Sequence, residues 1–435
     1  MENVEKILYQ PLANNPMHSS QVYGGVIALQ GIYRSIPVLH GAQGCVGAIK
    51  SVLSRHYREP IPIQHIPIQA ESQITNDGEH YREIIQMVMS KHSPDVMAVI
   101  ETSCSEALGE VQRIDRISDL YKEIFSNRLL FGMHLPEDEG SLESGYARTT
   151  HTVIMKIIEM TGKGKRKLRR NRINLLPGSH LTPGDVMELK EIIASFGIEV
   201  IVLPDLSSSL TGHLMTGYTN LSRGGAPLDY LKEMTTSAYT IAIGKSMESC
   251  GRLLYEEMKI PYIMFNGVTG LQESDEFFLF LRQFSQNEGQ IKYRWERQLL
   301  LDCMLDTRSV FRGKTMVASL EPDHLVSLYQ PLSEMGMKSF QSVISAPSQT
   351  EAFIPGVVRV GDMHDMEKMA VTGSDLWVSN GYGEATSKKH NIPFIPLGFP
   401  VFNRFGSPIN VSVGYRGTAH RLNHFGNVLN KIDVI

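Results

Sequence analysis

The chain has few cysteines and lacks the local motifs with which a single chain builds a metal, redox or nucleotide site. Only four of its 435 residues are cysteine, and no two of them form a Cys-x-x-Cys pair. His-Glu-x-x-His and Gly-x-Gly-x-x-Gly are also missing. The triplet Gly244-Lys245-Ser246 resembles the end of a phosphate-binding loop, but Tyr239 stands where that loop requires its first glycine. These absences exclude self-contained zinc, dithiol, dinucleotide and P-loop chemistry.

The chain also has no long apolar run and no strong excess of one charge. No uninterrupted apolar stretch reaches about 18 residues, and residues 1–6 do not form a basic region followed by an apolar one. We therefore expect a cytoplasmic protein without a membrane partner, in which widely spaced cysteines are thiols and not disulfides. The net charge of −4 argues against a nucleic-acid partner.

Short apolar runs alternate with helical segments along most of the chain, which predicts an α/β fold of parallel sheets flanked by helices. We expect three domains, at residues 1–165, 170–305 and 310–435. The basic run 163–172 lies between the first two. It is interpreted as a solvated linker, with an electrostatic patch for an acidic partner as the alternative.

Cys45 is the most informative residue. It follows the turn His40-Gly41-Ala42-Gln43-Gly44, which closes an apolar strand, and it opens a helical segment. The positive end of a helix dipole favours a thiolate, and Gly44 lets the backbone approach whatever the sulfur binds. These properties suit an iron–sulfur ligand. One cysteine cannot hold a cluster, so other ligands must come from elsewhere in the chain or from a partner.

Cys104 occupies an equivalent position, directly after the apolar strand 96–100. If the two strands are adjacent and parallel, their ends bring Cys45 and Cys104 together to face one cluster. The alternative is a small buried thiol that only packs. Cys250 and Cys303 lie within helical segments, and for them we predict burial in the core.

Six stretches carry a resemblance that covers nearly the whole chain: residues 37–45, 55–60, 179–185, 204–207, 398–402 and 413–417. Together they resemble the β-type subunits of the nitrogenase component 1 superfamily. The resemblance implies three Rossmann-like domains, an α2β2 heterotetramer with an α-type partner, and a cluster at each αβ interface. It also implies an ATP-dependent iron protein that docks over that cluster and delivers electrons.

The resemblance also assigns individual residues. Cys45 matches a cluster cysteine that the family's β-type subunits keep, and Cys104 matches a further one that many scaffold subunits lack. Ser20 stands where catalytic β subunits have a third cysteine, and Ser141 matches a serine that approaches the oxidised cluster. The implied cluster is a P-cluster-like [8Fe-7S] group or a [4Fe-4S] group. A second, larger iron–sulfur cofactor is expected in the partner.

Two functions remain open. In the first, the chain is a non-autonomous subunit of a nitrogenase-like reductase, such as a methylthio-alkane reductase, that relays electrons to a cofactor in the α subunit. In the second, it is a scaffold subunit on which the iron–molybdenum cofactor is assembled. The overall pattern favours the scaffold and Cys104 favours the reductase; we expect the reductase. Lys50, Arg55 and Arg58 are candidates for docking the iron protein.

Overall fold

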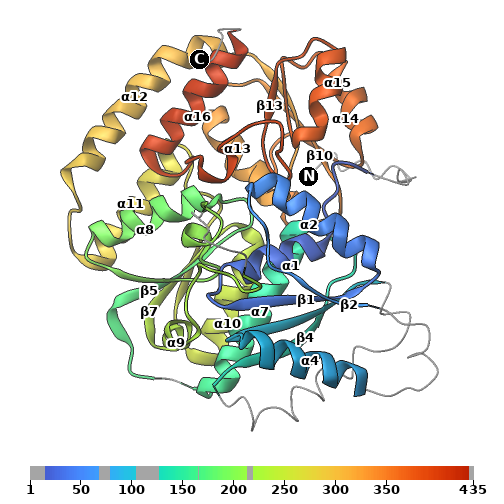
Figure 1. The fold of residues 1–435 in the computed structure, drawn as a ribbon. Coiled ribbons are helices and arrows are strands. Elements are labelled where there is room, and N and C mark those ends of the chain that lie inside the picture. Colours follow the sequence, from blue (N-terminus) through green and yellow to red (C-terminus); the bar gives the residue numbers. More distant parts are fainter. Residues whose placement is uncertain (1–14, 68–78, 104–126, 165, 213–218, 431–435) are drawn as a thin grey trace.

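The computed structural model describes residues 15–67, 79–103, 127–164, 166–212 and 219–430, and these build three parallel sheets covered by helices (Figure 1). The expected α/β class with three Rossmann-like domains is confirmed. The boundaries of the domains remain a prediction. Among the described residues, no helix has the length and apolar character to span a bilayer.

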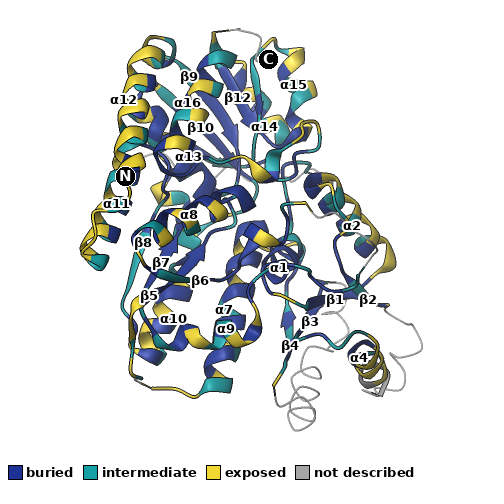
Figure 2. Cartoon of the chain, turned by 60° about the vertical axis from the view of Figure 1, so that its left-hand side comes forward, coloured by how far each residue is buried: buried dark blue, intermediate teal, exposed yellow. Residues whose placement is uncertain are grey.

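The first sheet has the strand order β2-β1-β3-β4. Both β1 and β3 are buried along their whole length, as expected of parallel strands covered on both faces (Figure 2). The strands are β1 Ser35–Gly41, β2 Gln64–Pro67, β3 Val96–Glu101 and β4 Leu129–His134. The helices are α1 Gln21–Gln30, α2 Gln43–Tyr57, α4 Glu79–His92 and α7 Leu142–Thr161.

The second sheet has the order β6-β5-β7-β8 and the third the order β11-β10-β9-β12-β13. The second contains β5 Arg169–Pro177, β6 Glu199–Val202, β7 Ser237–Ile243 and β8 Tyr262–Phe265, with helices α8 Pro183–Ser195, α9 Leu228–Lys232, α10 Glu248–Met258 and α11 Leu271–Ser285. The third contains β9 Thr315–Ser319, β10 Ser339–Ile344, β11 Val357–Val360, β12 Leu376–Ser379 and β13 Phe394–Pro396.

Helices α13 to α16 pack against the third sheet, α12 packs on α16, and short 3-10 helices follow several strands. The α-helices are α12 Ile291–Phe311, α13 Pro322–Glu334, α14 Met363–Ala370, α15 Glu384–Lys389 and α16 Gly414–Leu429. The short ones are η1 Leu206–Ser208, η2 Glu233–Thr236, η3 Lys245–Met247, η4 Gln349–Phe353, η5 Gly381–Gly383 and η6 Ser407–Ile409.

The domains share cores. One continuous cluster of buried apolar side chains joins α1 and α7 of the first domain to α10 of the second. A second cluster joins the second and third sheets. Helices α1 and α7 approach so closely that a Cβ on Gly24 would lie 1.9 Å from the Leu142 carbonyl oxygen, and one on Gly145 would lie 2.0 Å from that of Gln21. The glycines therefore permit backbone-to-backbone packing that no other residue allows.

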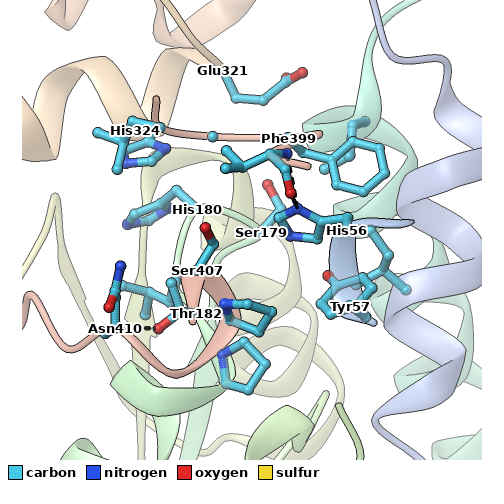
Figure 3. Close-up of a pocket in the computed structure, with 18 of the residues that line it drawn as sticks. His56, Tyr57, Ser179, His180, Thr182, Glu321, His324, Phe399, Ser407 and Asn410 are labelled. Atoms are coloured by element: carbon cyan, nitrogen blue, oxygen red, sulfur yellow. Dashed lines mark hydrogen bonds between the residues drawn. The ribbon is translucent and has the colours of Figure 1, made fainter. Parts of the chain in front are cut away.

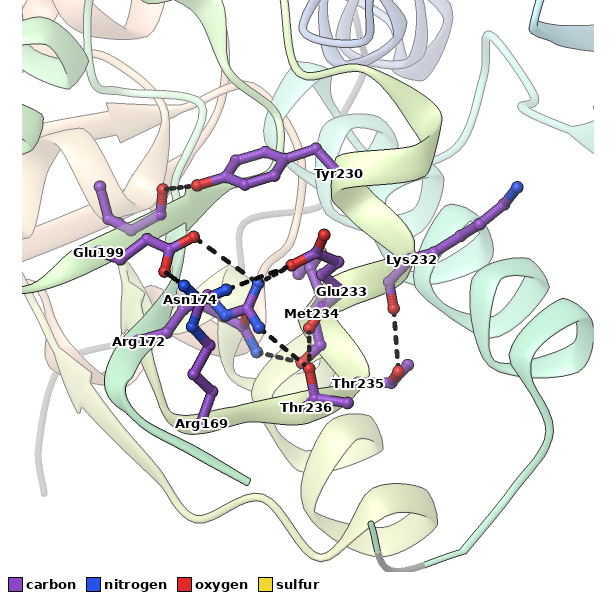
Figure 4. Close-up of polar contacts among 11 residues, drawn as sticks. Arg169, Arg172, Asn174, Glu199, Tyr230, Lys232, Glu233, Met234, Thr235 and Thr236 are labelled. Atoms are coloured by element: carbon purple, nitrogen blue, oxygen red, sulfur yellow. Dashed lines mark hydrogen bonds and ion pairs between the residues drawn. The ribbon is translucent and has the colours of Figure 1, made fainter. Parts of the chain in front are cut away.

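The second half of the basic run 163–172 is not a linker, because β5 begins at Arg169. Arg172 is buried and pairs with Glu199 and Glu233, and Arg169 pairs with the same two carboxylates (Figure 4). A buried guanidinium needs such partners to offset its lost hydration. These two arginines hold β5 to its neighbours, so the charge available to an acidic partner is smaller than the sequence suggests.

Candidate functional site

The ends of β1 and β3 lie side by side. The strands are parallel and His40 pairs with Glu101, and the backbone N–H and hydroxyl of Thr102 both donate to the His40 carbonyl oxygen at 3.3 Å. The expected adjacency of the strands that precede the two cysteines is thus confirmed. Cys104 itself lies outside the described residues, so its role as a ligand stays a prediction.

The residue before Cys104 is tied to the loop that follows β4. The Ser103 hydroxyl donates to the Asp138 carboxylate at 2.6 Å and accepts from the Glu137 N–H at 2.8 Å. The loops after β1, β3 and β4 therefore meet at the carboxyl edge of the first sheet. In open parallel sheets, this edge is where ligands gather.

Cys45 lies in the first turn of α2, which begins two residues earlier than expected, at Gln43. Its N–H donates to the Ala42 carbonyl oxygen at 3.1 Å, so this amide is paired within the chain. The first turn contains no acidic residue. The helix dipole therefore acts on the thiol without an opposing carboxylate in the same turn, which favours the thiolate.

The surface around Cys45 is made of small residues. Cys45 is half-buried, whereas Gly44 and Gly47 are exposed, and a Cβ built on either glycine would meet nothing within 4 Å. A bulky group or a partner chain can therefore approach the sulfur closely. Gly44 leaves the space that a cofactor would need, and its role in binding one stays a prediction.

Helix α1 brings further groups to this edge. Tyr23 is the third residue of α1, and its pKa rises to about 12, chiefly through burial, with smaller contributions from nearby Glu137 and Cys45. The Gln21 amide donates to the Glu139 carbonyl oxygen at 2.8 Å. The beginning of α1 thus lies against the loop after β4 and close to Cys45.

Ser20 and Ser141 precede the first residues of α1 and α7, and the packing of these helices places both serines at the same end of the pair. The Ser141 hydroxyl donates to the Glu321 carboxylate at 2.5 Å. Ligation of iron by Ser141 would require this hydrogen bond to break. A role for Ser20 or Ser141 in binding the cluster stays a prediction.

Glu321 belongs to a buried acidic cluster that sequence reasoning missed. Glu143 and Asp323 are buried and Glu321 is half-buried, and desolvation raises the pKa of each carboxyl, that of Glu321 to about 7. Asp323 accepts from two N–H groups of η3 at 2.9 and 3.0 Å, and its own N–H donates to Glu143 at 2.8 Å. The cluster therefore joins all three domains behind Ser141.

This cluster predicts a specific pH dependence. Because the folded pKa of Glu321 lies above the usual value of about 4.5, the native state binds the proton more tightly than the unfolded chain. Stability should therefore fall as the pH rises from about 5 to 8. Glu321→Gln keeps an acceptor for Ser141 and removes the titration, so we expect it to be more stable than the wild type at pH 8, by about 2 kcal/mol.

Thermal unfolding of the purified protein from pH 5 to 8 tests this expectation. Exposed Glu256, which has no ion pair within the described residues, provides the control, and the pH profile of Glu256→Gln should run parallel to that of the wild type. Parallel profiles for the wild type and Glu321→Gln would refute a raised pKa at Glu321.

The other two described cysteines are packed in the core, as expected. Burial raises the pKa of Cys250 to about 12 and also raises that of Cys303. Their thiols lie 3.6 Å from the carbonyl oxygens of Ala147 and Ala419, respectively. Neither is suited to hold a metal as a thiolate.

The basic residues proposed for docking are partly engaged within the chain. The Arg55 guanidinium lies 4.3 Å from the ring centroid of Phe402, and Arg58 donates to the Phe402 carbonyl oxygen at 2.5 Å and lies over Phe405. Lys50 is half-buried, which lowers its pKa. Both arginines thus fix α2 to the third domain, and this contact accounts for their presence without a docking partner.

Comparison with known proteins establishes the family. Residues 20–430 match the family described as nitrogenase component 1 type oxidoreductase, and the chain belongs to this family. It is 34% identical to the nitrogenase iron-molybdenum cofactor biosynthesis protein NifN of Nostoc sp., over 96% of this chain and 93% of that protein. A second NifN, from Rippkaea orientalis, is 33% identical over 97% and 94% of the two chains.

Nitrogenase itself is also similar to this chain. The molybdenum-iron protein beta chain of Clostridium pasteurianum is 29% identical over 96% of this chain and 94% of that protein. The solved structure titled "Nitrogenase Cp1 at pH 6.5" matches with a TM-score of 0.88 and 26% identity, and the match covers 98% of this chain and 95% of that chain. The nitrogenase component 1 fold is thereby confirmed.

The preference for a reductase subunit was wrong. Seven relatives at 28–34% identity are named as NifN, over nearly the full length of this chain. The reductase reading gave most weight to Cys104, a single position outside the described residues. The whole-chain pattern, which favoured the scaffold, was the better guide.

The described residues suit a cluster that this chain shares with a partner better than a cluster held by this chain alone. The family binds iron–sulfur clusters and forms heterotetramers with an α-type partner. Among the described residues, no group of three or more histidine, cysteine or acidic side chains is arranged to hold a metal. A half-buried cysteine at a helix start, bordered by exposed glycines, suits a cluster whose other ligands come from outside this part of the chain.

Proposed function

We propose that this chain is a NifN-type scaffold subunit for the biosynthesis of the nitrogenase iron–molybdenum cofactor. The observation that carries the proposal is the near full-length similarity to proteins named NifN. Cys45 at the edge of the first sheet supports it, because a half-buried cysteine at a helix start can serve as one ligand of a cluster shared with a partner.

We further propose an α-type partner in an α2β2 assembly, with an iron–sulfur cluster at the αβ interface. Cys45 supplies the ligand from the described part of the chain, and a [4Fe-4S] group is the form expected. When bound, the cluster supplies one-electron chemistry. The chain orients the sulfur through α2, leaves access through Gly44 and Gly47, and limits water through the buried residues beneath.

Deletion of this chain from its host tests the function. We expect the host's nitrogenase to accumulate without its iron–molybdenum cofactor and to lose at least ten-fold in activity, because assembly would stop before transfer. The measurement is molybdenum and iron content of the purified nitrogenase, together with its activity. Addition of the purified complex of this chain and its partner should restore both. A nitrogenase with normal metal content in the deletion strain would contradict the proposal.

A further inference from the structure

A cavity of about 100 Å³ lies where the three domains meet (Figure 3). The first domain contributes the end of α2, the second the loop after β5, and the third the start of α13, the loop after β13 and one turn of α16. Its polar lining includes Ser179, His180, Glu321, His324 and Arg421. None of these residues belongs to the edge of the first sheet that carries Cys45.

Two buried histidines face this cavity. Three of their four ring nitrogens accept or donate no hydrogen bond within the described residues. His180 and His324 are 8% and 6% exposed, and their ring centroids are 6.1 Å apart. Both nitrogens of His180, Nε2 of His324 and the Ser179 hydroxyl are buried and have no hydrogen-bond partner among the described residues. Buried polar groups normally have partners, so these four atoms point to a bound polar species.

The histidines are neutral. Burial is the main cause, and the nearby Arg421 guanidinium adds to it: together they lower the pKa of His180 to about 3 and that of His324 well below its usual value. Each ring therefore offers one N–H donor and one acceptor. The His180 and His324 rings can therefore donate hydrogen bonds to a ligand without adding positive charge to that of Arg421.

Arg421 is the positively charged group of the cavity, and the Glu321 carboxyl, which also lines it, is kept protonated below about pH 7 by its raised pKa. Within the part of the chain that the structure describes, the Arg421 guanidinium forms no hydrogen bond and no ion pair, although it lines the cavity. Asp185 attracts it, but that carboxylate already accepts from the N–H groups of Thr182, Ser412 and Val413. The five N–H donors of the guanidinium therefore remain available, in a geometry that suits oxyanions.

We propose that this cavity binds one small tetrahedral oxyanion of the class of phosphate, sulfate and molybdate, with Arg421 as its charge partner and His180, His324 and Ser179 as neutral donors. The cavity volume of about 100 Å³ is enough to admit one such ion. A cation would be repelled by Arg421. The inference goes beyond cofactor assembly and does not depend on it.

Equilibrium dialysis of the complex of this chain and its partner against phosphate, sulfate and molybdate, each alone, tests the proposal. We expect saturable binding of at least one of the three, with about one ion per copy of this chain. Arg421→Gln should weaken that binding at least ten-fold. Arg416→Gln is the matched control, because Arg416 lies on the same helix but pairs with Glu188, and it should bind like the wild type.

A second variant guards against a folding defect in Arg421→Gln. His180→Leu removes two nitrogens that make no hydrogen bond within the described protein, so it should fold, and it should weaken binding at least five-fold. The ion that binds most tightly of the three identifies the oxyanion that the cavity is built to bind. The proposal is overturned if the wild type binds none of the three ions saturably, or if Arg421→Gln binds as well as Arg416→Gln.

Discussion

Cys45→Ala should remove the iron of the αβ interface from the complex of this chain and its partner. Cys45 is the one cysteine in the described residues that is accessible, placed at a helix start and bordered by glycines. Loss of one thiolate from a cluster that usually needs four should abolish it, so we expect a loss of about four irons per αβ pair. Iron and sulfide analysis with EPR, on anaerobically purified complex, measures the loss.

Cys303→Ala is the control for this variant. It removes a thiol of the same size from the core, where Cys303 donates to the Ala419 carbonyl oxygen and lies 3.2 Å from the Asn423 side-chain oxygen. We expect normal iron content and a modest loss of stability, about 1 kcal/mol. A Cys45→Ala complex with the iron content and EPR signal of the wild type would show that Cys45 is not a ligand.

Gly145→Ala should strongly destabilise the first domain, although it adds only one methyl group. Its Cβ would lie 2.0 Å from the Gln21 carbonyl oxygen and 2.6 Å from the Gln21 Cα, so α1 and α7 must separate. Overpacking of this kind against backbone costs about 3 kcal/mol or more. Because Ser20 and Ser141 begin these helices close to Cys45, iron content should fall as well. Thermal unfolding and iron analysis of the complex measure the two effects.

Gly426→Ala provides the matched control within α16. The nearest atom to its added Cβ would be 3.4 Å away, an ordinary contact, and alanine favours a helix over glycine by up to about 1 kcal/mol. We expect an unchanged or slightly higher unfolding temperature. Equal unfolding temperatures for Gly145→Ala and Gly426→Ala would contradict the close packing of α1 on α7.

Local sequence predicted much of the scaffold that positions the site. The buried parallel strands, the adjacency of the ends of β1 and β3 and the burial of Cys250 and Cys303 follow from short apolar runs and from what comes directly after them. These features depend on neighbours in the chain or on the general rules of parallel sheets.

Contacts between distant segments could not be predicted. Ser141 and Glu321 are 180 residues apart, and nothing in either local sequence indicates that one donates to the other. The same holds for Arg58 and Phe402, and for Arg421 beside His180. The segment Glu321-Pro322-Asp323 after β9 did carry one signal, two acids at the end of a buried strand, but its partners come from other domains.

The iron content of the αβ interface tests the account most directly. The complex should be purified anaerobically from cells that do not make the cofactor precursor, so that interface iron is counted alone. The scaffold account predicts about four irons and matching sulfide per αβ pair, with the EPR signal of a reduced four-iron cluster after dithionite treatment. About eight irons per interface, together with reduction of a small substrate by the complex, its iron protein and ATP, would contradict it.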